Sequence, residues 1–362
     1  MPLPSRLRAL ILLSVVLELP LLGRLVRLLT GEPRVEQIIV DGVPVEVVKP
    51  ARGGPWPAWV FVNGAHPLRR TEPVVARLSR GLARAGYLVL VPDVPGLGEG
   101  TITARTLEAT VAVTAAASRR ADVVGERVAL IGASTGAALA LLTAGRPELA
   151  ERISVVAAVA PFADLERMIC LATTRSYSEN GAFRSYAVTD LQRQVVARSL
   201  VATISDAGER ERLHADLDRA AREERDPIST LPCELDGLTS ETQAVLRLLQ
   251  NDNAERFAEL YEGLPEPVPS LLTQLSPLAG CRGVCAPVEV VVPPSDVYFP
   301  PGEAYSLAAA LPDVHLTITA TLDHTRPQLS LGRLRDLRAF DGFVMRGLAR
   351  ARVGAAATSR SR

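Results

Sequence analysis

Two hydrophobic patterns alternate along the first half of the chain. Continuous apolar runs predict buried strands, and apolar residues recurring every three to four positions predict amphipathic helices. Strands are expected at 35–40, 43–48, 59–62, 87–91, 128–131 and 153–159, and helices at 72–85, 106–118 and 134–144. Asp41-Gly42 between the first two strands is a hairpin signal. Apolar strands that alternate with helices are typical of an α/β protein whose parallel sheet is covered on both faces.

The alternation stops at about residue 162 and returns near residue 284. The intervening segment indicates helix and loop, with no convincing strand, including a charged helix over 210–225 and a helix over 240–249 opened by a capping box of Ser240 and Gln243. The later pattern predicts strands at 288–292 and 315–320 and helices at 303–311 and 331–348. We therefore expect an N-terminal hydrophobic helix (1–30), a core (31–161 and 284–350), a helical cap insertion (162–283) and a flexible tail (351–362).

The N-terminal apolar run, residues 9–22, has three open interpretations. It follows Arg6 and Arg8 and is shorter than the ~20 residues that a bilayer-spanning helix needs. No cleavage site follows it, since Arg24 and Arg27 come next. It is a helix packed on the protein, a membrane-surface anchor, or a true span or signal peptide. We expect a cytoplasmic location, with membrane association through residues 1–30 as the alternative.

Composition narrows the class of protein. Hydrophobic residues make up 48% of the 362 positions and charged residues 22%, which is typical of a globular chain. The net charge is zero and no basic stripe stands out, so no nucleic-acid partner is expected. Of the four cysteines, Cys281 and Cys285 are four apart, and no second close pair completes a zinc site. We therefore expect neither a metal nor a cofactor.

The segment Gly132-Ala133-Ser134-Thr135-Gly136 fits the pattern G-x-S-x-G. It follows an apolar strand and opens a helix, which is the setting of a nucleophile elbow. Small neighbours relieve the crowding of so tight a turn, and the helix N-terminus behind Ser134 favours developing negative charge. The alternatives are a plain glycine turn or a phosphate loop, although the usual phosphate-loop patterns are missing.

A nucleophilic serine needs a base and an acid. Among His66, His214, His315 and His324, only His324 lies just after the last predicted strand. Asp296 lies just after the strand at 288–292, and 28 residues separate it from His324, enough for one helix and one strand. The chain order serine, acid, histidine is that of the hydrolase fold with this elbow. Asp323 adjoins His324 in sequence, so its side chain is expected to point elsewhere.

An oxyanion hole requires two backbone N–H donors. One is expected from Thr135, the residue after the serine, and the other from the loop that follows the third strand, in "VFVNGAHP". Gly64 allows close approach of the backbone there, and the Ala65 N–H is the candidate donor. For Asn63 and His66 in the same loop, lining the pocket and simple exposure both stay open.

In these features the chain resembles the α/β-hydrolases. The matching residues are Asn63-Gly64-Ala65, Asp93-x-Pro95-Gly96-x-Gly98, the elbow from Gly132 to Gly136, Asp296 and His324. The resemblance implies a mostly parallel eight-stranded sheet flanked by helices, with a cap inserted after strand six. Two features depart from the family: Asn63-Gly64 replaces the common His-Gly pair, and the cap matches no known cap.

The predicted reaction is acyl transfer to water. Ser134 attacks an ester-like carbonyl, His324 takes its proton, and Asp296 orients the imidazole. The expected partner is a small, lipophilic acyl substrate, as for a carboxylesterase or lipase. Amides, thioesters and carbon–carbon bonds are alternative targets of the same triad. A non-catalytic binding module with this fold is a second class of function, and a membrane-anchored partner protein is a third.

Overall fold

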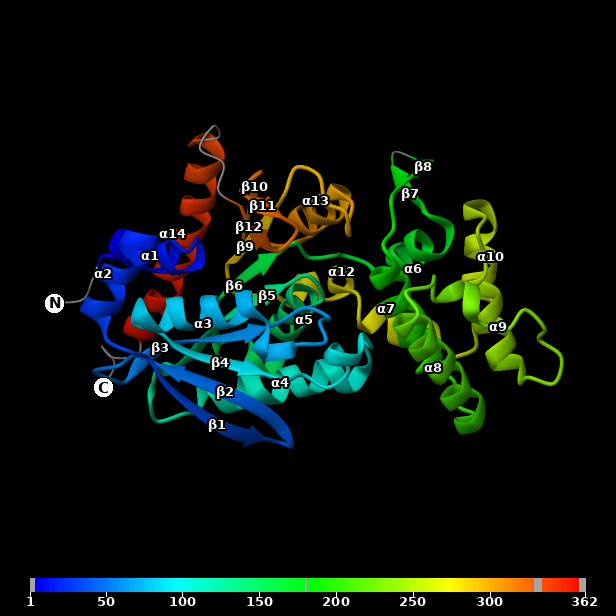
Figure 1. Cartoon of the computed structure of the whole chain (residues 1–362), viewed down its shortest axis with the longest axis horizontal. Coiled ribbons are helices and arrows are strands. Elements are labelled where there is room, and N and C mark those ends of the chain that lie inside the picture. The colour runs from blue at the N-terminus through cyan, green and yellow to red at the C-terminus, as the bar shows by residue number, and fades with distance from the viewer. Residues whose placement is uncertain (1–3, 180, 329–333, 358–362) are drawn as a thin grey trace.

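The computed structural model describes residues 4–179, 181–328 and 334–357. Its main sheet has eight strands in the order β1-β2-β4-β3-β5-β6-β9-β10 (Figure 1). The β1–β2 hairpin is antiparallel and β2 runs antiparallel to β4, whereas all later pairs are parallel. The prediction of a mostly parallel eight-stranded sheet is confirmed. The strands are β1 (Arg34–Val40), β2 (Val43–Lys49), β3 (Trp56–Val62), β4 (Leu88–Pro92), β5 (Val123–Ala133), β6 (Ile153–Val159), β9 (Val288–Val292) and β10 (Val314–Ile318).

Helices cover both faces of this sheet because successive residues of its strands point to opposite sides. In β3, Val60 and Val62 enter one hydrophobic cluster, and Trp59 and Phe61 enter the other. Packed on the first face are α4 (Ala104–Ser118), α5 (Thr135–Ala144), α12 (Pro277–Gly280) and α13 (Pro301–Ala310); on the second face are α1 (Ser5–Val16), α3 (Pro73–Arg84) and α14 (Leu334–Ala357).

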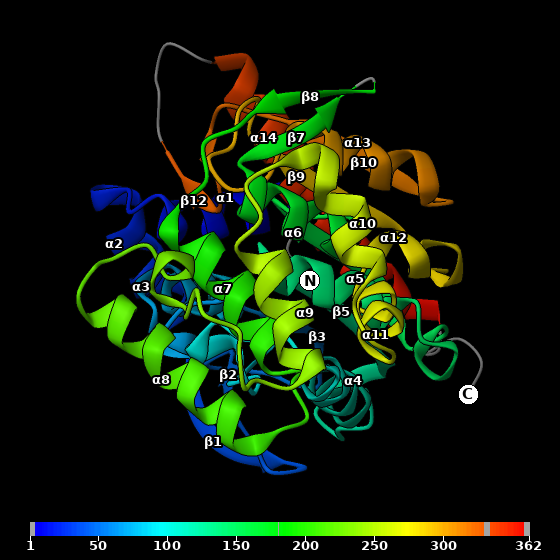
Figure 2. The same cartoon turned by 90° about the vertical axis from the view of Figure 1, so that its right-hand side faces the viewer.

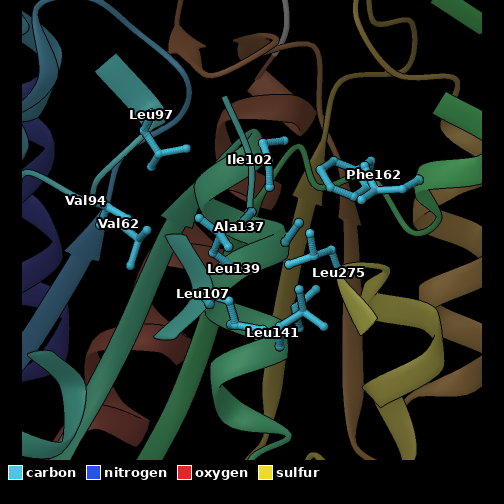
Figure 3. Close-up of a cluster of buried hydrophobic side chains, with 14 of the residues drawn as sticks. Val62, Val94, Leu97, Ile102, Leu107, Ala137, Leu139, Leu141, Phe162 and Leu275 are labelled. Carbon is cyan, nitrogen blue, oxygen red and sulfur yellow. The ribbon is translucent and has the colours of Figure 1, made fainter. Parts of the chain in front are cut away.

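One part of the larger cluster joins the core to the inserted segment. Figure 3 shows Leu139 and Leu141 of α5 among buried side chains that include Phe162 and Leu275. Phe162 lies where the chain leaves the sheet after β6, and Leu275 lies shortly before it returns. Both ends of the insertion are therefore anchored in the same apolar core as the helix that follows β5.

The insertion lies beyond the carboxyl ends of the parallel strands, on the right of Figure 1 and toward the viewer in Figure 2. Its elements are α6 (Leu165–Thr174), β7 (Ser176–Glu179), β8 (Ala182–Ser185), α7 (Asp190–Val201), α8 (Ala207–Arg222), α9 (Ser240–Leu249), α10 (Phe257–Glu262) and α11 (Val268–Gln274).

Two local predictions for the insertion were wrong. No strand was expected, but β7 and β8 pair as an antiparallel hairpin. These strands have four residues each and are largely exposed, so they carry no apolar alternation that a pattern could reveal. The N-cap of α9 is Thr239, whose side chain accepts from the Thr242 N–H, one residue before the predicted box at Ser240. Either residue is a good N-cap, so the pattern left the choice ambiguous.

The N-terminal segment forms two helices where one was expected, because Pro20 begins a second helix, α2 (Pro20–Thr30), bent by 120° from α1. Helix α1 packs on α3 and α14 and buries Ala9, Ile11 and Leu12. Within the described ranges, no single helix has the length and apolar character to cross a membrane, and only the bent pair of α1 and α2 meets that test jointly.

The C-terminal helix is longer than predicted. Helix α14 continues through Ala357, past residue 350, after which a flexible tail was expected. Alanine and arginine are among the strongest helix formers, so the segment 348–357 extends the helix despite the glycine at position 354. The rest of the predicted tail, 358–362, and the first residues of the predicted helix, 331–333, lie outside the described residues.

The packing of α1 predicts a large effect of Ile11→Ala, because Ile11 is only 6% exposed whereas its neighbour Leu10 is 47% exposed. Truncating a buried isoleucine lowers the free energy of unfolding by about 2–5 kcal/mol, and an exposed truncation changes it by less than about 0.5 kcal/mol. Urea denaturation of the two variants measures this difference. Equal midpoints for Ile11→Ala and Leu10→Ala would show that α1 does not pack on the core in solution.

Candidate active site

The residues with candidate chemistry follow four parallel strands of the sheet. Asn63, Gly64 and Ala65 come after β3, Ser134 after β5, Asp296 after β9 and His324 after β10. The parallel strands end at one edge of the sheet, which is where open α/β sheets bind their ligands. Segments far apart in the sequence therefore meet at a single site.

The turn at Ser134 is strained and closely packed. Ser134 has φ 55° and ψ −124°, a backbone conformation that non-glycine residues rarely adopt, and its N–H donates to the Val159 carbonyl at 2.8 Å. A Cβ atom at Gly132 would overlap the Gly136 carbonyl, and one at Gly136 would overlap the Val62 carbonyl. The two glycines thus let α5 begin directly against the end of β3.

His324 and Asp296 form a hydrogen-bonded pair. The distance from His324 Nδ1 to Asp296 Oδ2 is 2.8 Å, and the two side chains are 12% and 4% exposed. The other carboxylate oxygen of Asp296 accepts from the Tyr298 N–H at 2.7 Å. The carboxylate is therefore held from both sides, and with Nδ1 engaged, Nε2 is the ring nitrogen available for chemistry.

Aromatic residues that the sequence analysis missed surround this pair. The rings of Tyr298 and Phe299 lie 4.4 Å and 5.5 Å from the His324 ring, centroid to centroid. From the insertion, the Tyr186 hydroxyl donates to the Asp296 carbonyl. Burial and the nearby Asp296 carboxylate raise the pKa of Tyr186 to about 12, so its hydroxyl stays protonated. The aromatic pair two and three residues after Asp296 was visible in the sequence, but nothing there pointed to Tyr186.

A cavity of about 380 Å³ opens at this edge of the sheet. Ser134, Thr135 and His324 line it, so the hydroxyl and the imidazole face the same space. Its roof comes from the insertion, through residues of α6, α7 and α11. Most of this roof is apolar, with Met168, Ile169, Leu191, Val195, Val196 and Leu272.

The loop after β3 lies directly against the serine. A Cβ atom at Gly64 would lie 3.2 Å from the Ser134 Cβ, so only glycine permits this approach without displacement. Ala65 lines the cavity, and Thr135 is the first residue of α5, where helix N–H groups lack intrahelical acceptors. The two predicted oxyanion donors therefore border the cavity beside Ser134.

Asn63 and His66 also line the cavity. The Asn63 side chain accepts from the Gly64 N–H at 2.9 Å and donates to the Arg69 carbonyl at 3.0 Å, and it thereby braces the loop. His66 Nδ1 accepts from the Leu68 N–H at 3.2 Å. Asn63 thus supports the loop in which the family commonly has His-Gly.

The other histidines and Asp323 take no part in this pair. His214 lies on α8, His315 on β10, and neither lines the cavity. The Asp323 carboxylate accepts from the Gln328 side chain at 3.0 Å, away from the His324 ring nitrogen that Asp296 holds. All four cysteines are free thiols, and within the described ranges no cluster of three metal-ligating side chains occurs.

A buried carboxylate ties the insertion to the core. Glu303 of α13 is fully buried and accepts from the backbone N–H groups of Ala163 and Asp164 at 2.7 and 3.0 Å. Arg167 of α6 and the Tyr177 hydroxyl of β7 reach the same carboxylate at 3.2 Å each. Burial raises the pKa of Glu303, although these donors oppose the shift. Nothing in the sequence singled this residue out.

Together, the fold and this site define a serine hydrolase of the α/β-hydrolase fold. The family model for X-Pro dipeptidyl-peptidases (S15 family) matches residues 41–254, which is more than half of the chain. The chain therefore belongs to the S15 family. No curated protein matches its sequence.

Several solved structures are similar to this chain at low sequence identity. 2,6-Dihydroxy-pseudo-oxynicotine hydrolase is 15% identical with a TM-score of 0.51, and the match covers 87% of this chain and 68% of that one. Proline iminopeptidase of Mycobacterium smegmatis is 16% identical with a TM-score of 0.46, covering 89% and 100%. The esterase rPPE, a mutant, is 16% identical with a TM-score of 0.46, covering 90% and 83%. At 15% identity, the likeness to the first of these structures concerns the fold alone.

The hydrogen bond between His324 and Asp296 predicts that Asp296→Asn strongly slows reaction at the serine. An amide in this place favours the wrong imidazole tautomer, which costs up to about 10⁴-fold in serine hydrolases. Labelling by a fluorophosphonate probe measures the loss. The matched control is Asp323→Asn, next to the same histidine, which should label at nearly the parent rate. A larger loss in the control would exchange the roles assigned to these two carboxylates.

Proposed function

We propose that this protein hydrolyses carboxylic esters with lipophilic acyl groups, and that Ser134, His324 and Asp296 carry the reaction. The observation behind the proposal is the His324–Asp296 hydrogen bond beside a strained serine, in a cavity with mostly apolar walls. Aligned groups of this kind activate a hydroxyl that is otherwise a weak nucleophile.

The proposed reaction has two halves. Ser134 Oγ attacks the ester carbonyl while His324 Nε2 accepts the hydroxyl proton, and the resulting oxyanion accepts hydrogen bonds from the Thr135 and Ala65 amides. The carbon–oxygen bond to the alcohol then breaks, and the alcohol leaves with the proton from His324. In the second half, water attacks the acyl-enzyme with the same proton transfers and releases the acid and free Ser134.

The character of the cavity favours an ester over a peptide substrate. A free peptide amino terminus is charged, and burying it among apolar side chains requires a carboxylate partner. Glu72 and Asp323 are the acidic side chains among the described lining residues, and both already accept local hydrogen bonds. Glu72 accepts from the Val75 N–H at 2.9 Å as the N-cap of α3. Cleavage of X-Pro peptides is the second candidate, and the family match favours it.

A panel of substrates tests the proposal. We expect purified protein to release p-nitrophenol from p-nitrophenyl butyrate and to leave an Xaa-Pro-p-nitroanilide almost uncleaved. Ser134→Ala should lower ester turnover by about 10⁴-fold or more, because no other group replaces the nucleophile. The reverse preference would favour the peptidase, and turnover unchanged in Ser134→Ala would exclude Ser134 as the nucleophile.

We also propose that α2 rests on an anionic lipid surface. Leu21, Leu25, Leu28 and Leu29 are between 50% and 83% exposed, and their spacing places them on one side of the helix, opposite the buried Gly23 and Val26. The exposed Arg24 and Arg27 lie beside them, and their charge complements anionic headgroups. An apolar helical face bordered by arginines is typical of helices that lie in the plane of a membrane interface.

From the leucine face of α2 we predict that Leu21→Asp combined with Leu28→Asp weakens binding to phosphatidylglycerol vesicles by about tenfold or more. The reason is that burial of each leucine side chain contributes ~1.5–3 kcal/mol to the binding free energy. Co-sedimentation measures the effect. Ile39→Asp with Leu334→Asp is the control, because these residues are 75% and 64% exposed elsewhere on the surface. Equal binding of both double variants would exclude α2 as the lipid contact.

A further inference from the structure

A second, smaller cavity of about 90 Å³ adjoins the cavity at Ser134. It lies between the sheet and the helices α1, α3 and α14, which Figure 1 shows grouped on the same side of the sheet. Its walls are almost entirely apolar: Leu12 and Val16 come from α1, Leu82 from α3, and Phe340 and Phe343 from α14. We call this cavity the side chamber.

The side chamber and the cavity at Ser134 share a wall. Val74, Leu78, Ile131, Val159 and Thr325 line both spaces. Four of these five residues are apolar, and Thr325 directly follows His324 in the chain. The same five residues therefore border both spaces, and side-chain rotamers rearrange much faster than catalytic turnover.

We propose that the side chamber binds the distal carbons of the substrate's acyl chain, while the ester group lies at Ser134. This inference rests on the ester hydrolase function proposed above and adds the substrate class, medium-chain acyl esters. Dry apolar cavities bind apolar ligands, and an engineered cavity of about 150 Å³ holds benzene. The side chamber is smaller than that and suits only the last few carbons of a chain.

The proposal gives α1 a place in substrate binding. Leu12, Leu13 and Val16 of α1 form part of the chamber's wall opposite the sheet. The segment before β1 therefore closes the space that the chain end enters. Each buried methylene adds ~0.8 kcal/mol to binding, which is about fourfold in affinity. Two or three carbons in the chamber are worth about tenfold or more.

Gly347 of α14 offers a way to fill the chamber from outside the catalytic site. It lines the chamber but not the cavity at Ser134. A Cβ atom there would meet only Trp59, at an ordinary contact distance of 3.7 Å, so a larger side chain has room to extend. A leucine also has the higher helix propensity, which favours a folded variant. Gly342→Leu on the same helix is the matched control. Gly342 lines neither cavity, and a Cβ atom there would meet only the end of the Arg346 side chain.

The test compares Gly347→Leu with Gly342→Leu in two assays. In the first, kcat/KM is measured for p-nitrophenyl decanoate and p-nitrophenyl butyrate. We expect Gly347→Leu to lose about tenfold or more on decanoate and less than about twofold on butyrate, with Gly342→Leu like the parent on both. Equal losses on the two esters, or none, would overturn the proposal.

The second assay needs no turnover. Calorimetry measures decanoate binding to Ser134→Ala protein, alone and combined with each glycine variant. We expect Gly347→Leu to weaken decanoate binding by about tenfold and Gly342→Leu to leave it unchanged. Equal affinities would exclude the chamber as a chain-binding site even in an active esterase. If the parent cleaves no ester but binds decanoate in a manner that Gly347→Leu disrupts, the ester hydrolase function fails and the chain-binding site stands.

Discussion

The close approach of α5 to the end of β3 is the constraint on which the site depends. Gly132 and Gly136 bring backbone against backbone, so that the chain turns within a single residue and Ser134 takes a conformation it would not adopt alone. A strain of about 1–3 kcal/mol at such a residue persists only when the surroundings over-determine it. Here the hydrogen bond from the Ser134 N–H to the Val159 carbonyl and the burial of helix α5 hold Ser134 in this conformation. The position of the serine is therefore a property of the sheet.

The other groups of the candidate site are held beside Ser134 by contacts of different kinds. Asp296 is held by backbone N–H groups of its own loop, and it holds His324 in turn. Aromatic rings on the same loop limit where the imidazole can move. The insertion contributes the roof of the cavity and the Tyr186 hydroxyl. The core thus supplies the candidate reacting groups, and the insertion covers the cavity that they line.

Much of this arrangement could be predicted from the sequence, because it follows from strong local signals. Apolar runs predicted where the strands lie along the chain. Because β3, β5, β9 and β10 are parallel, the loops that follow them lie at the same edge of the sheet. The parts that escaped prediction depend on contacts between distant segments. In the sequence, Glu303 is an ordinary acidic residue at the start of a helix. Only the folded structure brings the Ala163 N–H and the Arg167 side chain to its carboxylate. Tyr186 follows an exposed hairpin without apolar alternation. The side chamber exists only because α1, α3 and α14 leave a gap that no single segment encodes.

The carboxylate of Glu303 also has a consequence for how molecules enter and leave. It binds the first residues after β6, the helix α6 and the β7 strand at one buried point. Removing these donors would leave a buried carboxylate without partners, which costs free energy. The part of the roof next to Glu303 is therefore not free to move away from the core. The insertion is also held on the side of His324, because the Tyr186 hydroxyl donates to the Asp296 carbonyl and the Gln192 side chain donates to the Tyr298 carbonyl. A roof fixed at both points is a rigid part of the cavity wall, so the shape of the cavity, and not a hinge movement, limits the size of the molecules that fit in it.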